Sequence, residues 1–574
     1  MLSWRSTGGA APEWARKAAT IAAACAWLTA LGVLRYRLPY GAGNRDEAFY
    51  SAMPYSFLLG NRPYVDELAL HQNAGILMLP FFRVYLAIVG SADGIILFNR
   101  YLYFAYVSIC SVVAYRLARR VTGPATACCA AALIVAFAYC NLFALSYNTI
   151  GAFSFFCGVV CTASALLRAR PGFRLFGASL LFLAAMFSYP GMAPAVGVYL
   201  CVVVLWLVRK TPRATLWHGL LGLGAGMVVT LSTVCGLLSW LGKAGIERLR
   251  AFSQSMGYAQ NTLSKLDFVH SDVWPWRWAL LAFGALFVAI PLAIRVAGRW
   301  LWLAAPLLVP AYLYAYSMGV NMSKPTAATI CLTALPVLAP ACLALNRRWE
   351  HAGLVLQMLW LPSVLSMVCI ACSSANGISA SSLGVLGALL AGVLGLSALL
   401  ADVRRQGRAH WFCAGLVFAS LFCCMLYHEC YSMFLGVYDD SPSFATHTTR
   451  VHHGPMRGCI ASPFDARVLE TVDKDLKSLA PHAKTITVFD AFATGYLSTR
   501  LQPRTFTTWV LWMMKPAYTK QVVKQTFGNR ANVPDLVLAI HVDDGARHYW
   551  QKYLEHYHAA IRRPELHYII WQKN

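Results

Sequence analysis

The side chains of this chain that are best suited to chemistry lie between positions 44 and 71. Two neighbouring acids, Asp46 and Glu47, come first, in the segment Asn-Arg-Asp-Glu-Ala-Phe-Tyr. The side chains that follow are Arg62, Tyr64, Asp66 and His71. A carboxylate can take a proton from a hydroxyl group, and a guanidinium can stabilise charge that develops on a leaving group. One acid alone would be typical of a solvated loop end, whereas the whole set favours a functional site.

The composition indicates what kind of molecule holds these residues. Of the 574 residues, 58% are hydrophobic and 13% are charged, whereas a soluble domain carries about a quarter charged residues. At about 20 apolar residues for each span, the chain has room for many transmembrane helices and one soluble domain. We therefore expect a polytopic α-helical membrane protein.

The charge distribution argues against a nucleic-acid partner. The net charge is +24, which in a soluble protein would suggest binding to nucleic acid. Here +20 of that charge lies before His428, in the apolar part of the chain. Lys and Arg in short cytoplasmic loops set the orientation of membrane helices, so the excess belongs to topology.

About 13 apolar runs are candidates for transmembrane helices. The first lies at Ala18 to Leu34, and the others lie at about 94–115, 122–141, 149–167, 175–188, 191–208, 216–241, 277–294, 300–317, 326–345, 352–372, 383–401 and 411–427. Alternate loops between these runs carry arginine and lysine, as the N-terminus does. The positive-inside rule places those loops and the N-terminus in the cytoplasm, and an odd number of spans places the C-terminus outside.

These spans divide the chain into two expected domains. Residues 1–427 form the transmembrane domain, and its first outer loop, 35–93, carries the candidate site. Residues 428–574 form a soluble domain on the outer side. Within the loop, the stretch 71–90 is apolar but contains Pro80 and Arg83. We expect it to lie in the interface as an amphipathic helix, because a further span would turn the arginine-rich loops outward.

The tail has the pattern of an α/β domain. Short β-rich runs at 485–490, 536–541 and 567–571 alternate with helical stretches at 465–479 and 545–558. Such a domain is long enough to bury its own core.

The cysteines are not arranged as a metal set. Of the 18 cysteines, 16 precede His428, mostly in apolar runs where a thiol packs as a small hydrophobe. Cys430 and Cys459 lie in the polar tail. They could form a disulfide if the tail faces an oxidising compartment, and the sequence leaves this open.

The acidic pair, followed by Arg62-Pro63-Tyr64-Val65-Asp66 and His71, resembles the first outer loop of the GT-C class of membrane glycosyltransferases. The similarity is to bacterial members of the mannosyl- and arabinosyltransferase type, which use polyprenyl-phosphate sugars. Further matching segments are Asn99-Arg100, Ser146-Tyr147-Asn148, Ser374-Ala375-Asn376-Gly377, and the tail from Gly458 to Leu497. One segment departs from the pattern, because no proline follows His71.

The resemblance implies a GT-C-like fold and a glycosyltransferase activity. The enzyme would move a sugar from a polyprenyl-phosphate carrier to a glycan, lipid or protein acceptor at the outer face of the cytoplasmic membrane. In that family the first acid of the pair is the base, which assigns this role to Asp46, with inversion at the anomeric carbon if attack is direct. Glu47 would orient the acceptor or raise the pKa of Asp46 by like-charge proximity.

The leaving phosphate requires cations, and the other candidate residues are assigned to substrate binding. We expect Arg100 and Lys324 to reach the headgroup, with Arg45 and Arg62 behind them. Snorkelling to the membrane surface is the alternative explanation for Arg100 and Lys324. Tyr64, Asp66 and His71 would hold the sugar or a cation, and an ordinary turn explains Tyr64 and Asp66 equally well.

A divalent cation such as Mg or Mn is one of two open possibilities. Asp46, Asp66 and His71 could supply ligands, with waters completing the shell. The family that the chain resembles contains both metal-dependent and metal-independent members. The sequence therefore leaves metal dependence undecided.

Three other functions compete with the glycosyltransferase hypothesis. A transporter or lipid flippase would place ionisable groups in mid-membrane, and none of the apolar runs has a carboxylate in its core. A membrane assembly protein would tolerate replacement of Asp46, Glu47 and Arg100 together. An O-antigen ligase or polymerase would rely on arginines in a large outer loop, and the early acidic pair argues against it.

Overall fold

The computed structural model describes most of the chain. The described residues are 13–43, 46–69, 71–138, 141–255, 267, 269–271, 273–296, 332–346, 349–374, 377–403, 408–435, 444–489, 492–505, 507–508, 533–540 and 551–574. Arg45 and Lys324, both predicted to serve the phosphate, lie outside these residues, as does the predicted span at 300–317.

The described part of the transmembrane domain is helical throughout. Its longer helices are α1 (Glu13–Arg37), α2 (Asp46–Leu58), α3 (Gln72–Val89), α4 (Ile95–Val121), α5 (Pro124–Ala136), α6 (Tyr147–Leu166), α7 (Gly172–Ser188), α8 (Ala193–Lys210), α9 (Arg213–Ser255), α11 (Arg277–Val296), α16 (Leu361–Ser373), α18 (Leu386–Val403) and α19 (Arg408–Leu435). The shorter helices are α14 (Leu338–Leu345), α15 (Ala352–Val355) and α17 (Gly377–Ser381).

Within the described residues, nine helices are long and apolar enough to cross a membrane, and three more are apolar but shorter. This confirms a polytopic helical membrane protein with a separate C-terminal sheet domain. The number of 13 spans is not confirmed. The last helix of the bundle, α19, continues to Leu435, past the predicted boundary at residue 427.

The spans differ in how much of their surface other helices cover. In α6 and α18, 83% and 78% of the most apolar stretch is buried, whereas in α1 and α9 only 17% is buried. α5 is covered on all sides, because its run of alanines and cysteines lets α1 and α4 approach closely. The inner helices therefore pack against protein, and the apolar outer helices present their side chains to lipid.

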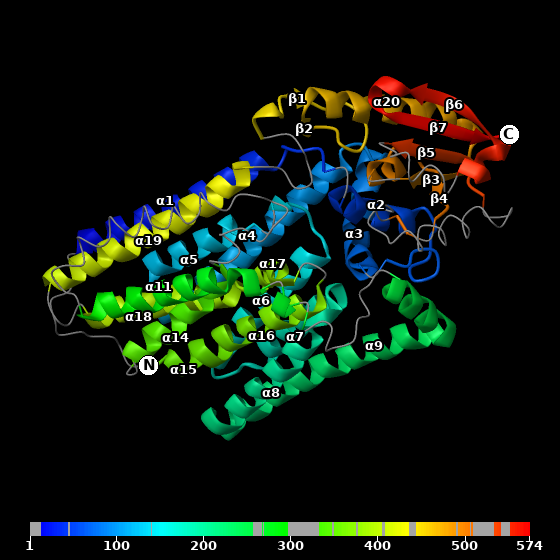
Figure 1. Ribbon diagram of the computed structural model, residues 1–574. Coiled ribbons are helices and arrows are strands. Elements are labelled where there is room, and N and C mark those ends of the chain that lie inside the picture. Colours follow the sequence, from blue (N-terminus) through cyan, green and yellow to red (C-terminus); the bar gives the residue numbers. More distant parts are fainter. Residues whose placement is uncertain are drawn as a thin grey trace.

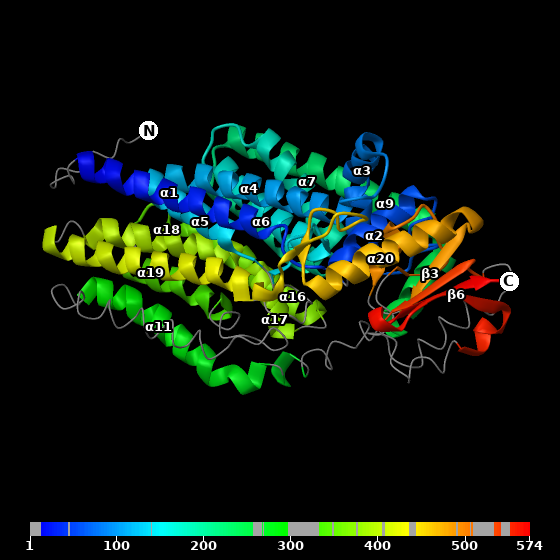
Figure 2. The ribbon, with the colours of Figure 1, turned by 90° about the horizontal axis from the view of Figure 1, so that it is seen from above.

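The first outer loop contains two helices that lie between the bundle and the tail. Figure 1 and Figure 2 show α2 and α3 at the end of the bundle that faces the sheet domain. On the tail side, α2 contacts the 3-10 helix Ala493–Leu497, which follows α20 (Pro463–Leu479) and β3 (Thr485–Phe489) in the chain. α3 satisfies the length and apolarity of a span, yet in Figure 1 it runs crosswise to α1 and α4. The expected interfacial position of α3 stays a prediction.

The tail is built on a five-stranded mixed sheet. Its strand order is β4 (Gln502–Pro503), β3 (Thr485–Phe489), β5 (Leu536–Ile540), β7 (Tyr568–Lys573) and β6 (Tyr557–Arg563). β3 pairs in parallel with β4 and β5, while β7 pairs antiparallel with β5 and β6. A two-stranded ladder of β1 (Thr449–Arg450) and β2 (Ile460–Ala461) precedes α20. The three predicted strands and the helix at 465–479 are confirmed.

The predicted helix at 545–558 is wrong at its C-terminal end. Residues 541–550 lie outside the described residues, Gln551–His556 form a 3-10 turn, and Tyr557 begins β6. β6 is held by pairing with β7. Tertiary hydrogen bonding therefore overrides the local helical pattern at this position.

Candidate functional site

The acidic pair opens α2, at the seam between the bundle and the tail. Asp46 is the first residue of the helix and is half-buried, whereas Glu47 is only 5% exposed. Acidic side chains are stabilised in the first turn of a helix, because the unpaired backbone N–H groups there carry partial positive charge. The helix thus fixes two neighbouring acids in different environments, one partly open and one closed.

Glu47 is closed off by a two-pronged ion pair with Arg100 of α4. Nε of Arg100 donates to Oε1 of Glu47 at 2.6 Å, and an Nη donates to Oε2 at 2.6 Å. The side chain of Arg100 is 2% exposed and that of Glu47 is 6% exposed. A planar guanidinium matches a carboxylate in this geometry, and the match is stronger and more directional than a lysine could make.

The remaining donors of Arg100 hold the backbone that leads into α2. They reach the carbonyl oxygens of Leu38 at 2.7 Å, Gly41 at 3.0 Å and Tyr40 at 3.2 Å. All five N–H groups of the guanidinium therefore have acceptors within the protein. Arg100 was predicted to bind the phosphate. Its placement shows that it organises the start of the loop, and contact with a phosphate remains a prediction.

A second buried arginine, at the end of α1, donates a hydrogen bond to the same backbone segment at Tyr40. Arg37 is fully buried and donates from Nε to the carbonyl of Met433 at 2.6 Å and from an Nη to the carbonyl of Tyr40 at 2.7 Å. Its guanidinium also lies over the rings of Phe143 and Phe444, at 5.0 and 5.2 Å from the centroids. Sequence reasoning missed this residue, because an arginine at a helix end usually snorkels to the surface.

Gly43 shows how closely the loop packs onto the ion pair. It has φ +54°, in the left-handed region that favours glycine. A Cβ at this position would collide with the carboxylate of Glu47 and approach the guanidinium of Arg100. Asn99 adds a further tie, since its amide donates to Ser51 of α2 at 3.2 Å and its oxygen accepts from Leu145 N at 3.1 Å.

The predicted Pro-Tyr-x-Asp turn is present. Arg62 and Asp66 close it with backbone hydrogen bonds and with a side-chain ion pair of 3.0 Å between Nε and Oδ2. Burial acts to raise the pKa of Asp66, but the hydrogen bonds and charge of Arg62 outweigh it and lower the pKa. Tyr64 occupies the left-handed region at φ +63°, and its hydroxyl donates to Asn73. The turn is thus locked by its own side chains.

His71 lies directly before α3 in an aromatic cluster. Its ring stacks on Tyr147 at 3.9 Å and meets Phe49 of α2 edge-on at 6.2 Å. Burial lowers the pKa of His71 to about 3. The imidazole is therefore neutral near pH 7 and contributes packing to the loop without a positive charge.

Glu67 is the residue of this loop that sequence reasoning left without a role. It is 1% exposed, and its Oε2 accepts from the backbone N and the hydroxyl of Thr508, both at 2.8 Å. Oε1 accepts from Ala69 N at 3.0 Å. Glu67 and Thr508 lie 441 positions apart in the sequence, so no local pattern could have paired them.

Further contacts join the first outer loop to the tail along its length. Pro39 and Gly41 exchange backbone hydrogen bonds with Ile460 at 2.7 and 2.8 Å. The other contacts are Tyr55 Oη to Thr499 O at 3.0 Å, Gln502 Nε2 to Asn61 Oδ1 at 2.9 Å, Arg500 Nη2 to Gly90 O at 2.6 Å and Lys477 Nζ to Asp93 Oδ1 at 3.1 Å. The loop and the tail therefore form one continuous seam.

The predicted site residues are brought together only in part. Asp46, Glu47 and Arg100 meet at one end of α2, while Arg62, Tyr64 and Asp66 form the turn between α2 and α3. In the part of the chain that the structure describes, no group of three or more His, Cys, Asp or Glu side chains is placed to hold a metal ion. The suggested set of Asp46, Asp66 and His71 remains a prediction. Cys430 and Cys459 are both thiols, and Cys459 lies 3.8 Å from Arg100.

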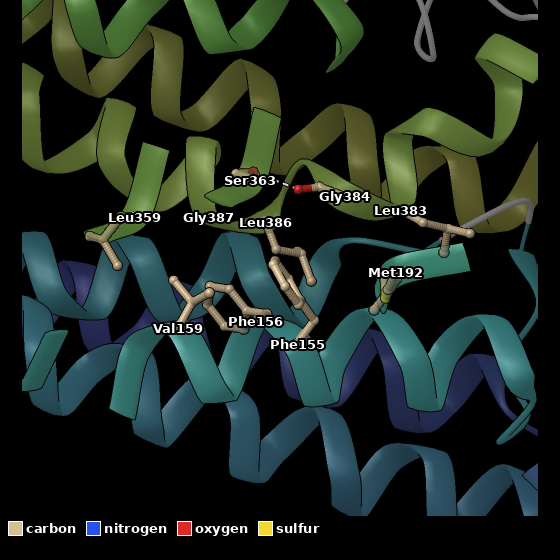
Figure 3. A pocket seen from close by; sticks show the side chains of 11 residues that line it. Phe155, Phe156, Val159, Met192, Leu359, Ser363, Leu383, Gly384, Leu386 and Gly387 are labelled. Atoms are coloured by element: carbon tan, nitrogen blue, oxygen red, sulfur yellow. Dashed lines mark hydrogen bonds between the residues drawn. The ribbon is translucent and has the colours of Figure 1, made fainter. Parts of the chain in front are cut away.

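A small cavity inside the bundle is separate from this site. It lies between α6, α16 and α18, and Figure 3 shows its lining of Phe155, Phe156, Val159, Met192 and Leu386. Its serine, Ser363, donates its hydroxyl to the carbonyl of Gly384 at 2.5 Å. None of the predicted site residues lines the cavity. Its lining is mostly apolar, and the hydroxyl of Ser363 is already hydrogen-bonded to the backbone, which is typical of imperfect helix packing.

No protein family and no curated protein matches the sequence. Three similar solved structures come from Archaeoglobus fulgidus. Its oligosaccharyltransferase AglB, in complex with an inhibitory peptide and a dolichol-phosphate, is 12% identical, with 95% of this chain and 73% of that chain covered and a TM-score of 0.45. An oligosaccharyltransferase complex with Zn and sulfate is 12% identical, with 94% of this chain and 71% of that chain covered and a TM-score of 0.40. The apo form of the oligosaccharyltransferase is 11% identical, with 96% of this chain and 73% of that chain covered and a TM-score of 0.44. Because the TM-scores and identities are low, we draw no functional conclusion from them.

Proposed function

We propose that this chain is a membrane glycosyltransferase of the GT-C type. It transfers a sugar from a polyprenyl-phosphate carrier to a glycan, lipid or protein acceptor at the outer face of the cytoplasmic membrane. The observation that carries the proposal is the unequal treatment of the acidic pair. Glu47 is sealed by Arg100, while its neighbour Asp46 stays half-buried where the apolar bundle meets the soluble tail.

This position suits a reaction between a lipid and a water-soluble or membrane-bound acceptor. An isoprenoid tail can remain in the bilayer while its phosphate and sugar reach the seam, and an acceptor can approach from the tail side. Carboxylates are effective bases when they are held within hydrogen-bond reach of the hydroxyl proton. α2 supplies that fixation, because the Arg100 ion pair holds its first turn against α4.

The proposed step balances without another reactant. The oxygen of the acceptor hydroxyl attacks the anomeric carbon as its proton moves to Asp46. The bond between that carbon and the phosphate oxygen breaks, and the electron pair leaves with the polyprenyl phosphate. A single displacement of this kind inverts the anomeric centre. Asp46 later releases the proton to water.

The residues around Asp46 divide into positioning and binding roles. Glu47 and Arg100 act as a pair that positions the first turn of α2, because both are buried and engaged with one another. The exposed Arg62, with Arg45 and Lys324 from the sequence, is assigned to the leaving phosphate. Tyr64, Asp66 and His71 shape the wall of the loop that faces the sugar.

The test is transfer in membranes that contain the chain. Wild-type membranes are incubated with a panel of radiolabelled polyprenyl-phosphate hexoses and pentoses, and label that enters glycan, lipid or protein is counted. Asp46→Asn should reduce transfer by at least ~100-fold, since it removes a general base. Glu565→Gln removes an exposed charge from the tail and is the matched control. Undiminished transfer by a well-expressed Asp46→Asn chain would refute the assignment.

A further inference from the structure

Glu67 presents an unusual combination of burial and partners. Its carboxylate lies at the seam between the first outer loop and the tail, with 1% of the residue exposed. Its donors are Thr508 N, Thr508 Oγ1, Ala69 N and the side chain of Thr507, and all of them are uncharged. Desolvation of a carboxylate is costly, and hydrogen bonds from neutral donors offset that cost only while they are all in place.

Most of the hydrogen bonds to Glu67 depend on the tail being docked against the loop. Three of these four hydrogen bonds come from the tail, and the two from Thr508 reach the same oxygen, Oε2. If the tail moved away, that oxygen would lose both partners at once. The bond from Ala69 N comes from the loop itself and remains in either case. The hydrogen bonds of Glu67 therefore stabilise the docked position of the tail. A carboxylate exposed to water in both positions would stabilise it far less.

The docking point connects to the start of α2 through packed residues. Ala69, which donates to Glu67, is two positions before His71, whose ring contacts Phe49. Phe49 lies in the first turn of α2, with Asp46. On the other side, the tail segment 499–505 contacts α2 and the residues after it through Thr499 and Gln502. Thr508 thus bonds to the part of the loop that leads to His71, and His71 contacts the first turn of α2.

We propose that Glu67 is a positioning residue that fixes the tail as a rigid wall of the active site through its hydrogen bonds to Thr508. The consequence for catalysis rests on the proposed function, whereas the docking itself does not. Glu67 acts at a distance from the reacting atoms, and its effect passes through the placement of residues 499–505, 507 and 508. The tail is then a fixed part of the site and not a mobile receptor for acceptors.

The docking is measured by cross-linking across a neighbouring contact. Cysteines replace Asn61 and Gln502, whose side chains are hydrogen-bonded at 2.9 Å, and a short bismaleimide joins them in membranes. Single-cysteine chains correct for the native thiols. Glu67→Ala should slow cross-linking by about tenfold or more, which corresponds to the loss of one to two hydrogen bonds.

Conservative variants distinguish the loss of the hydrogen bonds to Thr508 from misfolding of the chain. Glu67→Gln keeps an oxygen that can accept from Thr508, so its cross-linking should lie between wild type and Glu67→Ala. Thr508→Ser retains both donors and should behave as wild type. Thr508→Val keeps the shape but loses the hydroxyl, and it should slow cross-linking. Equal cross-linking rates in Glu67→Ala, Thr508→Val and wild type would overturn the proposal.

Transfer of label from the same polyprenyl-phosphate sugars gives the second readout. Glu67→Ala should lose transfer in proportion to its docking, and the bismaleimide tether should restore it. Failure of the tether to restore transfer would also overturn the proposal, because Glu67 would then act by another route. If the wild-type chain transfers no sugar at all, the proposed function fails, while the cross-linking rates still decide the docking.

Discussion

Glu47 and Glu67 lie in the same loop and are both buried, but the protein stabilises them in opposite ways. Glu47 is met by a guanidinium that lies within the bundle, while Glu67 is met by neutral donors from the tail and its own loop. The first arrangement places a charge pair beside apolar helices. The second places a lone carboxylate at a contact between two domains.

The difference shows which contacts hold the site and which contacts hold the tail to it. A buried ion pair loses most when one partner is removed, because the other charge is left in a poor solvent. A carboxylate held by neutral donors at a seam can instead recover solvation if the domains separate. We therefore expect changes at Glu47 to unfold the loop, and changes at Glu67 to release the tail.

The largest effect on stability is expected from Arg100→Ala. It leaves Glu47 buried without its guanidinium, which costs about 3–5 kcal/mol, and it also removes the donors to Leu38, Tyr40 and Gly41. Denaturant unfolding in mixed micelles measures the change. Arg83→Ala, at an exposed arginine of α3, should change stability by less than about 0.5 kcal/mol.

Replacing both members of the pair sharpens the comparison. Arg100→Met combined with Glu47→Met removes both charges and leaves two unbranched apolar side chains in their place. Such replacements are often neutral or stabilising, so the double variant should recover much of the stability that Arg100→Ala loses. A double variant as unstable as Arg100→Ala would show that the guanidinium's bonds to the backbone dominate, contrary to this account.

A smaller effect is expected from pH, through His71. Its pKa is lowered to about 3 by burial, whereas in the unfolded chain it is about 6.5. As pH falls below that ordinary value, the unfolded chain gains a proton that the folded chain does not. Stability should therefore fall by about 1.4 kcal/mol for each pH unit between the two pKa values.

The His71 contribution is isolated by comparison with His71→Phe, which retains a ring against Tyr147. Thermal unfolding of the two chains in detergent with EDTA, between neutral and mildly acidic pH, gives the difference. The slope for the variant should be shallower than that for wild type. Parallel curves would mean that His71 is protonated in the folded chain, and that the interior of the loop tolerates charge where we place none.

Much of the fold could be predicted from the sequence, because its signals are local. Apolar length identified a polytopic helical bundle, although not its number of spans. Turn residues identified the Arg62–Asp66 turn, and alternating β-rich runs identified β3, β5 and β7. The acidic pair was also recognisable, since its chemistry resides in adjacent residues. Pro80 and Arg83 predict an interfacial position for α3, and this stays a prediction, although α3 lies crosswise to the bundle in Figure 1.

The pairing of the site could not be predicted, because it depends on distant segments. Arg100 reaches Glu47 across 53 positions, and Thr508 reaches Glu67 across 441. Arg100 was assigned to the phosphate because an arginine at a helix end is ordinarily accessible, and burial beside Gly43 reverses that expectation. The end of the 545–558 helix failed for a related reason, since strand pairing with β7 decides the structure of Tyr557–Arg563.

The side of the membrane on which residue 46 lies tests the central claim most directly. Asp46→Cys, Glu565→Cys and Glu13→Cys chains are treated in intact spheroplasts with a membrane-impermeant maleimide, and wild type corrects for native thiols. We predict that positions 46 and 565 are labelled from outside and that position 13 is labelled only after lysis. Labelling of position 46 only after lysis, with position 565 labelled from outside, would contradict an active site between the first outer loop and the tail.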